Sequence, residues 1–257
     1  MGDLEFDNVV FGYGGSRLFD GFSALFPTGS ISCIVGPNGC GKSTLAKLAM
    51  GLVKPTSGRV RVAGRDVSSL AARERARLLG VLVQQQEAPM MTARELVACG
   101  RFPSCGSFSR LSGEDEERID EALSLAGVPE LRDRSLRSLS GGQRQRVRMA
   151  MVLAQDTPIV LLDEPTSFMD VAACFDMVRL IRQVRQRGKT VIAVIHDLNL
   201  ALSVADQVFV MERGRLAAQG EPTDGCVRAA IEQSFGVRLE HVQTGCGTAW
   251  VPFESRE

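Results

Sequence analysis

A glycine-rich loop between an apolar run and a helical segment constrains this chain more than any other feature. Residues 36–43 read Gly-Pro-Asn-Gly-Cys-Gly-Lys-Ser and fit the phosphate-loop pattern G-x-x-x-x-G-K-[ST]. The run 30–35 predicts a strand and 42–50 predicts a helix, which is the context that such a loop requires. Glycines let backbone N–H groups turn toward an anion, and the helix adds its positive dipole end. The loop therefore predicts a nucleotide-phosphate site in an α/β fold.

Three side chains at the end of the loop have distinct expected roles. Lys42 should reach the β- and γ-phosphates, Ser43 should ligate Mg²⁺ through its hydroxyl, and Thr44 should donate nearer the α-phosphate. Cys40 is expected to be inert, a small side chain between two glycines. The predicted ATP-binding residues of this segment are Gly36, Pro37, Asn38, Gly39, Cys40, Gly41, Lys42, Ser43 and Thr44.

Two uniformly apolar runs, 159–163 and 190–196, predict buried strands of a parallel sheet covered on both faces, and both end in polar residues. A buried carboxylate needs a charged partner, so Asp163 is expected to hold Mg²⁺ directly or through water. Glu164 is suited to polarise a water for in-line attack on the γ-phosphate. His196 should lie beside it at the carboxyl edge of the sheet and contact the γ-phosphate.

Two further side chains are predicted to touch the nucleotide or its metal. Tyr13, the only tyrosine, sits in a glycine-rich turn, where its ring could stack on adenine; the alternative is an aromatic residue at a strand edge. Gln84 follows the apolar run 81–83 and is placed to touch Mg²⁺ or the attacking water. Gln85 and Gln86 compete for that role, and Gln84 is preferred because it comes first.

The composition of the chain limits the classes of protein to which it can belong. The chain has 257 residues, 30 Lys+Arg and 30 Asp+Glu, and this balance argues against a non-specific nucleic-acid binder. Its seven cysteines have irregular spacing without a C-x-x-C pair, which favours a reducing cytosol over a disulfide framework or zinc site. The acidic start predicts no signal peptide, and the apolar runs are too short to cross a bilayer.

The segment from Thr92 to Leu136 changes to helical character. Ser112 and Asp115 predict a capped helix start, and Ile119, Ala122, Leu123 and Ala126 recur at helical spacing. The remaining predicted elements are strands at 4–11, 18–26, 207–211, 215–219, 238–243 and 249–252, a hairpin at 58–67, and helices at 143–154, 171–187 and 198–205.

The pentapeptide Leu-Ser-Gly-Gly-Gln at 139–143 lies between the phosphate loop and the carboxylate strand. With these motifs in this order, nearly the whole chain resembles the nucleotide-binding subunit of an ATP-binding-cassette (ABC) transporter. The resemblance implies an α/β fold: a P-loop ATPase core with a mostly parallel sheet, an antiparallel β subdomain and a helical insert. A single nucleotide-binding domain would cover 1–257, with 1–86 and 137–257 forming the core and 87–136 the helical subdomain.

The resemblance also implies roles for individual residues. A homodimer would sandwich each ATP between the phosphate loop of one copy and the signature of the other, formed by Ser140, Gly141, Gly142 and Gln143. Tyr13 would be the adenine-stacking aromatic, Gln84 the coupling glutamine, Glu164 the catalytic base and His196 the switch histidine. Asp170 would end a loop crossing the dimer axis. In that loop, Phe168 and Met169 are bulkier than is usual for the family.

A finer resemblance concerns the transported substrate. Residues 95–103, Glu-Leu-Val-Ala-Cys-Gly-Arg-Phe-Pro, are similar to a stretch of iron–siderophore importers, whose branch also serves haem and cobalamin. It implies integral-membrane permease partners bound through the helical subdomain, a substrate-binding protein farther away, and a peripheral place on the cytoplasmic face of the inner membrane. The docking surface would include Phe102, Phe108 and Leu111, with Arg101 paired to an acidic residue of the permease. The alternative is that Arg101 is a solvated cap and Phe102 a core residue.

Two alternatives stay open at this point. A soluble ABC-type ATPase in iron–sulfur assembly or ribosome handling would share every catalytic residue, and only the stretch around Arg101 argues against it. A non-hydrolytic ATP-gated dimerisation module would not need a base at Glu164.

Overall fold

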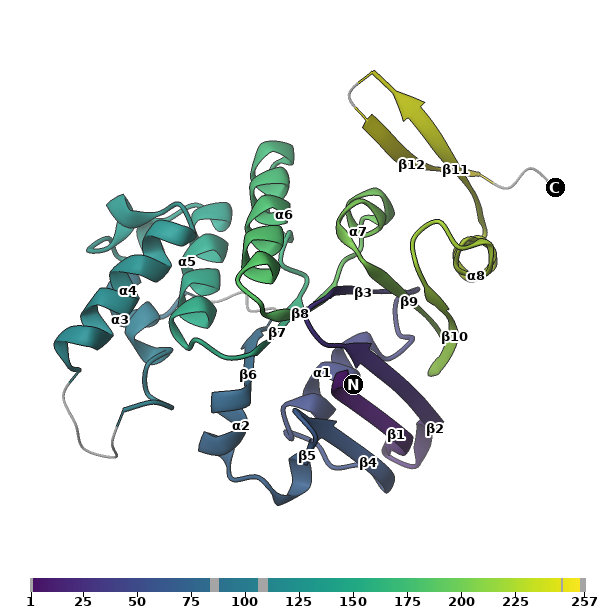
Figure 1. Cartoon of the computed structure of the whole chain (residues 1–257), viewed down its shortest axis with the longest axis horizontal. Helices are drawn as coiled ribbons and strands as arrows, with labels where there is room; N and C mark the ends of the chain where they lie inside the picture. The colour runs from purple at the N-terminus through teal and green to yellow at the C-terminus, as the bar shows by residue number, and fades with distance from the viewer. Residues whose placement is uncertain (1, 84–87, 106–110, 246, 255–257) are drawn as a thin grey trace. The chain divides into compact units, whose positions relative to one another are not determined.

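The computed structural model describes residues 2–83, 88–105, 111–245 and 247–254 (Figure 1). The chain forms two compact units, one from Met1–Leu70 with Thr190–Glu257 and one from Ala71–Lys189. The predicted α/β class with a mostly parallel sheet is confirmed, whereas the predicted subdomain boundaries stay a prediction. No helix within the described ranges is both long and apolar enough to cross a membrane.

In the first unit, four strands lie in the order β10-β9-β3-β8. The central strand β3 (Ile31–Val35) pairs in parallel with β8 (Thr190–Val194) and β9 (Gln207–Glu212), and β10 (Arg215–Gly220) is antiparallel to β9. Every residue of β3 and β8 is buried, which explains why both strands are uniformly apolar apart from small hydroxyl residues. The phosphate loop follows β3 directly.

A second sheet in the same unit is antiparallel, with the order β2-β1-β4-β5. Its strands are β1 (Gly2–Tyr13), β2 (Ser16–Pro27), β4 (Ser57–Val62) and β5 (Arg65–Asp66). Burial alternates along part of β2, as expected when one face packs on the core. The rings of Phe26 and Phe209 stack with centroids 4.2 Å apart, so they join this sheet to the parallel strands.

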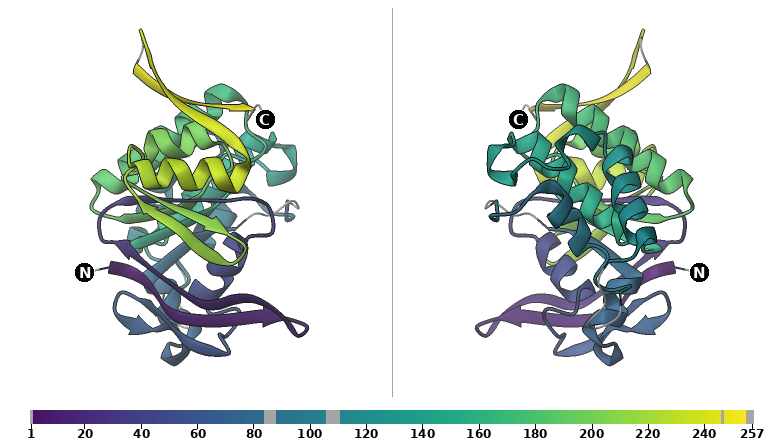
Figure 2. Two further views of the ribbon diagram at one scale, coloured as in Figure 1. Left: turned by 90° about the vertical axis from the view of Figure 1, so that its right-hand side faces the viewer. Right: turned by 90° about the vertical axis from the view of Figure 1, so that its left-hand side faces the viewer.

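Three helices and a hairpin complete the first unit. Helix α1 (Lys42–Ala49) follows the phosphate loop, α7 (Leu198–Val204) follows β8, and α8 (Gly225–Phe235) ends at a left-handed glycine. Helix α8 was not predicted. The strands β11 (Val237–Thr244) and β12 (Gly247–Glu254) form a separate ribbon that extends beyond α8 in both views of Figure 2. A short 3₁₀ turn, η1 (Val67–Ser69), follows β5.

The second unit pairs strand β6 (Leu79–Leu82) in parallel with β7 (Ile159–Asp163). Its long helices are α4 (Gly113–Leu125), α5 (Gly141–Ala154) and α6 (Val171–Gln186). The shorter elements are α2 (Ala72–Leu78), α3 (Ala93–Cys99), η2 (Pro129–Leu131) and η3 (Leu136–Ser138). The predicted apolar face of α4 is confirmed: Ile119, Ala122, Leu123 and Ala126 are all buried.

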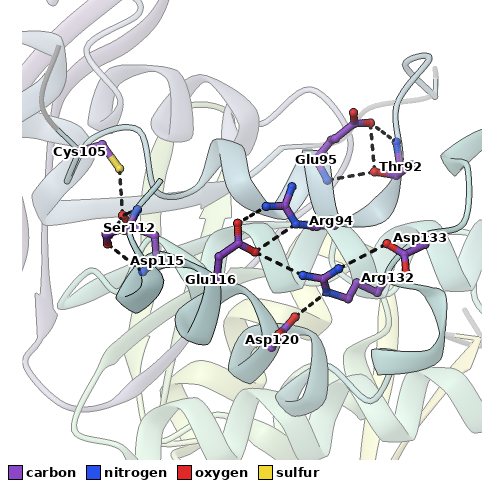
Figure 3. Close-up of polar contacts among 10 residues, drawn as sticks. All are labelled: Thr92, Arg94, Glu95, Cys105, Ser112, Asp115, Glu116, Asp120, Arg132 and Asp133. Atoms are coloured by element: carbon purple, nitrogen blue, oxygen red, sulfur yellow. Dashed lines mark hydrogen bonds and ion pairs between the residues drawn. The ribbon is translucent and has the colours of Figure 1, made fainter. Parts of the chain in front are cut away.

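Capping and ion pairs fix the helices between residues 92 and 133 (Figure 3). Thr92 and Ser112 begin α3 and α4 with reciprocal capping boxes, as predicted for Ser112. Glu116 on α4 pairs with Arg94 on α3 and with Arg132, and Arg132 also donates to Asp120 at 2.7 Å. Since these contacts join separate elements, they hold α3, α4 and the η2 region as one body.

The position of Arg101 in the structure differs from the one that the sequence predicted. Its side chain is 10% exposed; Nε donates to Asp115 at 2.9 Å and Nη1 donates to the carbonyl of Ala154 at 2.7 Å. Both predicted alternatives, a permease contact and a solvated cap, are therefore wrong. The Ser112 hydroxyl and amide, followed by the Arg101 guanidinium, hold the pKa of Asp115 well below its usual range.

We expect Arg101→Met to destabilise the protein by about 3 kcal/mol, because removal of one partner leaves a largely buried carboxylate without its cation. Urea unfolding at neutral pH measures the loss, and Arg118→Met on the exposed face of α4 is the control, with a change below about 0.5 kcal/mol. Because the pKa of Asp115 is lower in the folded than in the unfolded protein, its ionised carboxylate stabilises the fold at pH values above the unfolded pKa. The contribution of the Arg101–Asp115 pair should therefore be present at neutral pH and be lost only in strong acid. Equal losses in the two variants would contradict this assignment.

Candidate functional site

The phosphate loop is shaped by close backbone approaches that only glycine allows. A Cβ at Gly36 would lie 2.3 Å from the carbonyl oxygen of Met211, and one at Gly41 would lie 2.7 Å from the ring of Phe19. Gly41 has φ 112° and immediately precedes α1 as its N-cap, without a side-chain cap hydrogen bond. A loop of this shape before a helix start is suited to receive an anion, and its binding of nucleotide phosphates stays a prediction.

Lys42 is held inside this loop. It is 7% exposed, and its ammonium donates to the carbonyls of Gly36 at 2.6 Å and Pro37 at 2.9 Å. Cys40 Sγ lies 3.8 Å from the same ammonium and is buried, and this burial raises the pKa of the thiol. A raised pKa agrees with the expectation that Cys40 is not a reactive thiolate. Ser43 is exposed and Thr44 is buried on the first turn of α1.

The predicted carboxylates lie in the second unit. Asp163 is the last residue of β7 and is 8% exposed. Glu164 follows with φ 54°, a left-handed conformation that is uncommon for a residue with a side chain. Its carboxylate Oε2 accepts a hydrogen bond from the Ser167 hydroxyl at 2.9 Å. A carboxylate is a hard oxygen donor of the kind that Mg²⁺ prefers, and so is the hydroxyl of Ser43 in the other unit; their use as metal ligands stays a prediction.

The signature segment begins helix α5. Ser140 is its N-cap: the hydroxyl accepts from the amide of Gln143 at 3.2 Å, and the Gln143 side chain accepts from the Ser140 amide at 3.0 Å. A Cβ at Gly141 would lie 3.2 Å from the carbonyl of Phe168. Gly141 thus lets the Phe168 carbonyl approach the start of the helix closely, and a helix start is a general site for a phosphate.

The remaining predicted residues fall at element ends. Asp170 caps α6 by accepting from the amide of Ala173 at 2.8 Å. His196 is exposed and follows β8, one residue before Asp197, the N-cap of α7. Tyr13 ends β1, 49% exposed, with its ring edge on Phe11. Gln84 and its competitors Gln85 and Gln86 lie outside the described residues, as does Phe108.

Sequence reasoning missed the partners of Glu164. The Ser167 hydroxyl contacts its carboxylate, and Nε2 of Gln145, a buried residue of α5, donates to its carbonyl at 3.4 Å. The signal available for Ser167 was its place three residues after Glu164, a spacing typical of tight turns. No comparable signal pointed to Gln145, because its contact crosses from one element to another.

A phosphate-loop nucleotide-binding protein is defined by a strand, a glycine loop and a helix in this order, whose backbone donors can bind phosphate. The chain belongs to the ABC transporter family, whose model, described as "ABC transporter", matches residues 19–167. As a member of this family it binds and hydrolyses ATP.

The relatives and solved structures share most of the chain. The ferric enterobactin transport ATP-binding protein FepC of Escherichia coli (strain K12) is 40% identical over 91% of this chain and 88% of its own. The iron(3+)-hydroxamate import ATP-binding protein FhuC of Bacillus subtilis (strain 168) is 35% identical over 94% and 91%. A chain from an inward-facing ABC transporter described as of the metal-chelate type has a TM-score of 0.85, 25% identity and 98% coverage of both chains. A dimeric ATP-binding cassette bound to ADP and Pi has a TM-score of 0.76 and 28% identity over 86% of this chain and 99% of its own.

Proposed function

We propose that this chain is the ATPase subunit of a bacterial importer that energises uptake of an iron chelate, a siderophore complex or haem, or of cobalamin. The observation that supports the proposal is 35–40% sequence identity over more than 90% of the chain to relatives named for ferric enterobactin and iron(3+)-hydroxamate transport. The chain would act as a homodimer bound to integral-membrane permease subunits at the cytoplasmic face of the inner membrane. A substrate-binding protein would deliver the chelate to the permease.

ATP binding would use the cradle described above. The backbone N–H groups of residues 36–44 would surround the phosphates, and Lys42 would leave the carbonyls of Gly36 and Pro37 to reach the β- and γ-phosphates. Ser43 and Asp163, with Gln84, would hold Mg²⁺, which when bound neutralises charge on the phosphate oxygens. The ring of Tyr13 is exposed enough to stack on adenine.

Hydrolysis would follow general-base chemistry. Glu164 would accept a proton from water as that water attacks the γ-phosphorus, and the bond to the ADP oxygen would break on the opposite side. His196 would donate a hydrogen bond to the γ-phosphate and stabilise its negative charge. Signature donors at the start of α5 would come from the second copy, so each ATP would require both chains.

The permease is proposed to dock near the turn after α3. Phe102 on that turn is 62% exposed, whereas the neighbouring Pro103 is fixed because its carbonyl accepts from Arg73 at 3.0 Å and Arg77 at 2.7 Å. An exposed aromatic ring on a fixed turn can serve as an anchor for a partner helix. Closing and opening of the dimer would then move the permease.

We expect Phe102→Asp to leave the ATPase rate of the isolated protein within about twofold of wild type, since no catalytic group is touched. The same substitution should abolish co-purification with the permease encoded beside it and iron-chelate uptake by cells, because it puts a charge into an apolar contact. Pull-down and radio-iron uptake measure the two losses.

Leu52→Asp is the matched control for this experiment. Leu52 is 68% exposed beyond the end of α1, in the other unit of the chain. The Leu52→Asp variant should retain both permease binding and iron-chelate uptake. If Phe102→Asp also retains both, the docking surface lies elsewhere; if the wild-type complex transports no iron chelate, the proposed substrate class is wrong.

A further inference from the structure

The carboxylate of Glu164 is held by a tight turn formed by the residues that follow it. The Ser167 hydroxyl donates to Glu164 Oε2 at 2.9 Å, and the Ser167 amide donates to the Glu164 carbonyl at 3.2 Å. One residue therefore contacts both the side chain and the backbone of Glu164. The proposed mechanism uses Glu164 but assigns nothing to Ser167.

The backbone of this turn is strained and supported from outside. Glu164 has φ 54° and Phe168 has φ 65°, so left-handed residues stand at both ends of 164–168. Cys174 on the first turn of α6 has its Sγ 3.7 Å from the carbonyl of Thr166, and Gln145 contacts the carbonyl of Glu164. Such a conformation persists only where surrounding contacts over-determine it, which points to a use for the geometry.

The hydrogen bond fixes a degree of freedom that a glutamate otherwise keeps. The terminal torsion of a glutamate side chain is broad, so an unsupported carboxylate rotates between many orientations. A general base must lie within hydrogen-bond reach of the proton it accepts, and small misplacements are costly in rate. A donor on Oε2 selects one orientation before the water arrives.

We infer that Ser167 is a positioning residue for hydrolysis, whose hydroxyl orients the carboxylate of Glu164 toward the attacking water. This inference rests on the proposed role of Glu164 as the base. Ser167 itself is half-buried. Its effect on the rate is exerted through Glu164 alone.

The test is a double-mutant cycle on the full-length protein with Mg·ATP. Ser167→Ala should lower kcat by roughly tenfold, the scale of one hydrogen bond to a charged group, while KM for ATP stays within about twofold. Ser167→Thr, which keeps a hydroxyl, should restore most of the rate. In a Glu164→Ala background, Ser167→Ala should change the residual single-turnover rate by less than about twofold, because the acceptor is gone.

Thr166→Val removes the neighbouring hydroxyl of the same turn and should leave kcat unchanged. Urea unfolding of each variant measures whether the protein keeps its global stability, which is expected because Ser167→Ala retains the hydrogen bond from the amide of residue 167 to the Glu164 carbonyl. An equal loss of rate in both backgrounds, a change confined to KM, or no loss at all overturns the positioning role. Near-normal turnover in Glu164→Ala alone instead overturns the proposed base, so the two failures are distinguishable.

Discussion

Glu164→Gln should reduce the ATPase rate by roughly 10²- to 10⁴-fold, the range expected for loss of a general base. The amide keeps the shape of the side chain and can still accept the hydrogen bond from Ser167, but it cannot take a proton from water. ATP binding should survive, because the residues of the phosphate loop belong to the other compact unit. The variant should therefore accumulate as an ATP-bound dimer.

Phosphate release and gel filtration with ATP measure the two consequences. Glu117→Gln, an exposed carboxylate on α4, is the control and should hydrolyse ATP normally and show no excess of dimer. Turnover of Glu164→Gln close to the wild-type rate would show that another group is the base. Loss of ATP binding would show instead that the substitution damages the site itself.

A second expected result concerns how two copies build each ATP site. Lys42→Ala removes the phosphate cation, and Gly142→Asp puts a negative charge at the start of α5; each chain alone should be inactive. A Cβ at Gly142 has its closest neighbour, Cγ of Met169, at 3.9 Å, so the second variant should still fold. A purified heterodimer of the two variants should recover about half of the wild-type dimer rate, because one of its sites carries neither change.

The pairing of Lys42→Ala with Glu164→Gln is the matched control. Both residues are assigned to the same ATP, so this heterodimer has one defect in each site and should stay inactive. Two affinity tags select the heterodimers before the ATPase measurement. No recovery in the first mixture would mean that the signature acts on the ATP of its own chain. Recovery in the control would mean instead that Glu164 acts on the ATP of the partner copy.

The elements that the sequence predicted well are those coded by local patterns. The strands β3, β7 and β8 are uniformly buried, and a run of apolar residues of that length admits few other structures. Glycine spacing specified the phosphate loop for the same reason, since its backbone shape depends on residues next to one another. The family assignment also followed from motifs read in order along the chain.

Arg101 shows where this reasoning failed. A lone arginine in a motif-like stretch gives no sign of burial, and long charged side chains are usually exposed. Its partners, Asp115 and the carbonyl of Ala154, lie 14 and 53 residues away, so only the packed helices bring them to it. Helix α8 was missed for another reason: its moderate apolar pattern with two buried residues is hard to tell from a loop.

The sequence by itself determined the phosphate loop, the signature, the carboxylates that end β7 and hence the ABC family, because each is a short pattern whose chemistry depends on neighbouring residues. The tertiary structure decided which side chains are committed to internal contacts. It removed Arg101 from the surface, left Phe102 exposed, and placed the Ser167 hydroxyl on Glu164. Those outcomes depend on backbone turns and on contacts between helices that are far apart in the sequence. The distances between such residues are fixed only when the whole core packs.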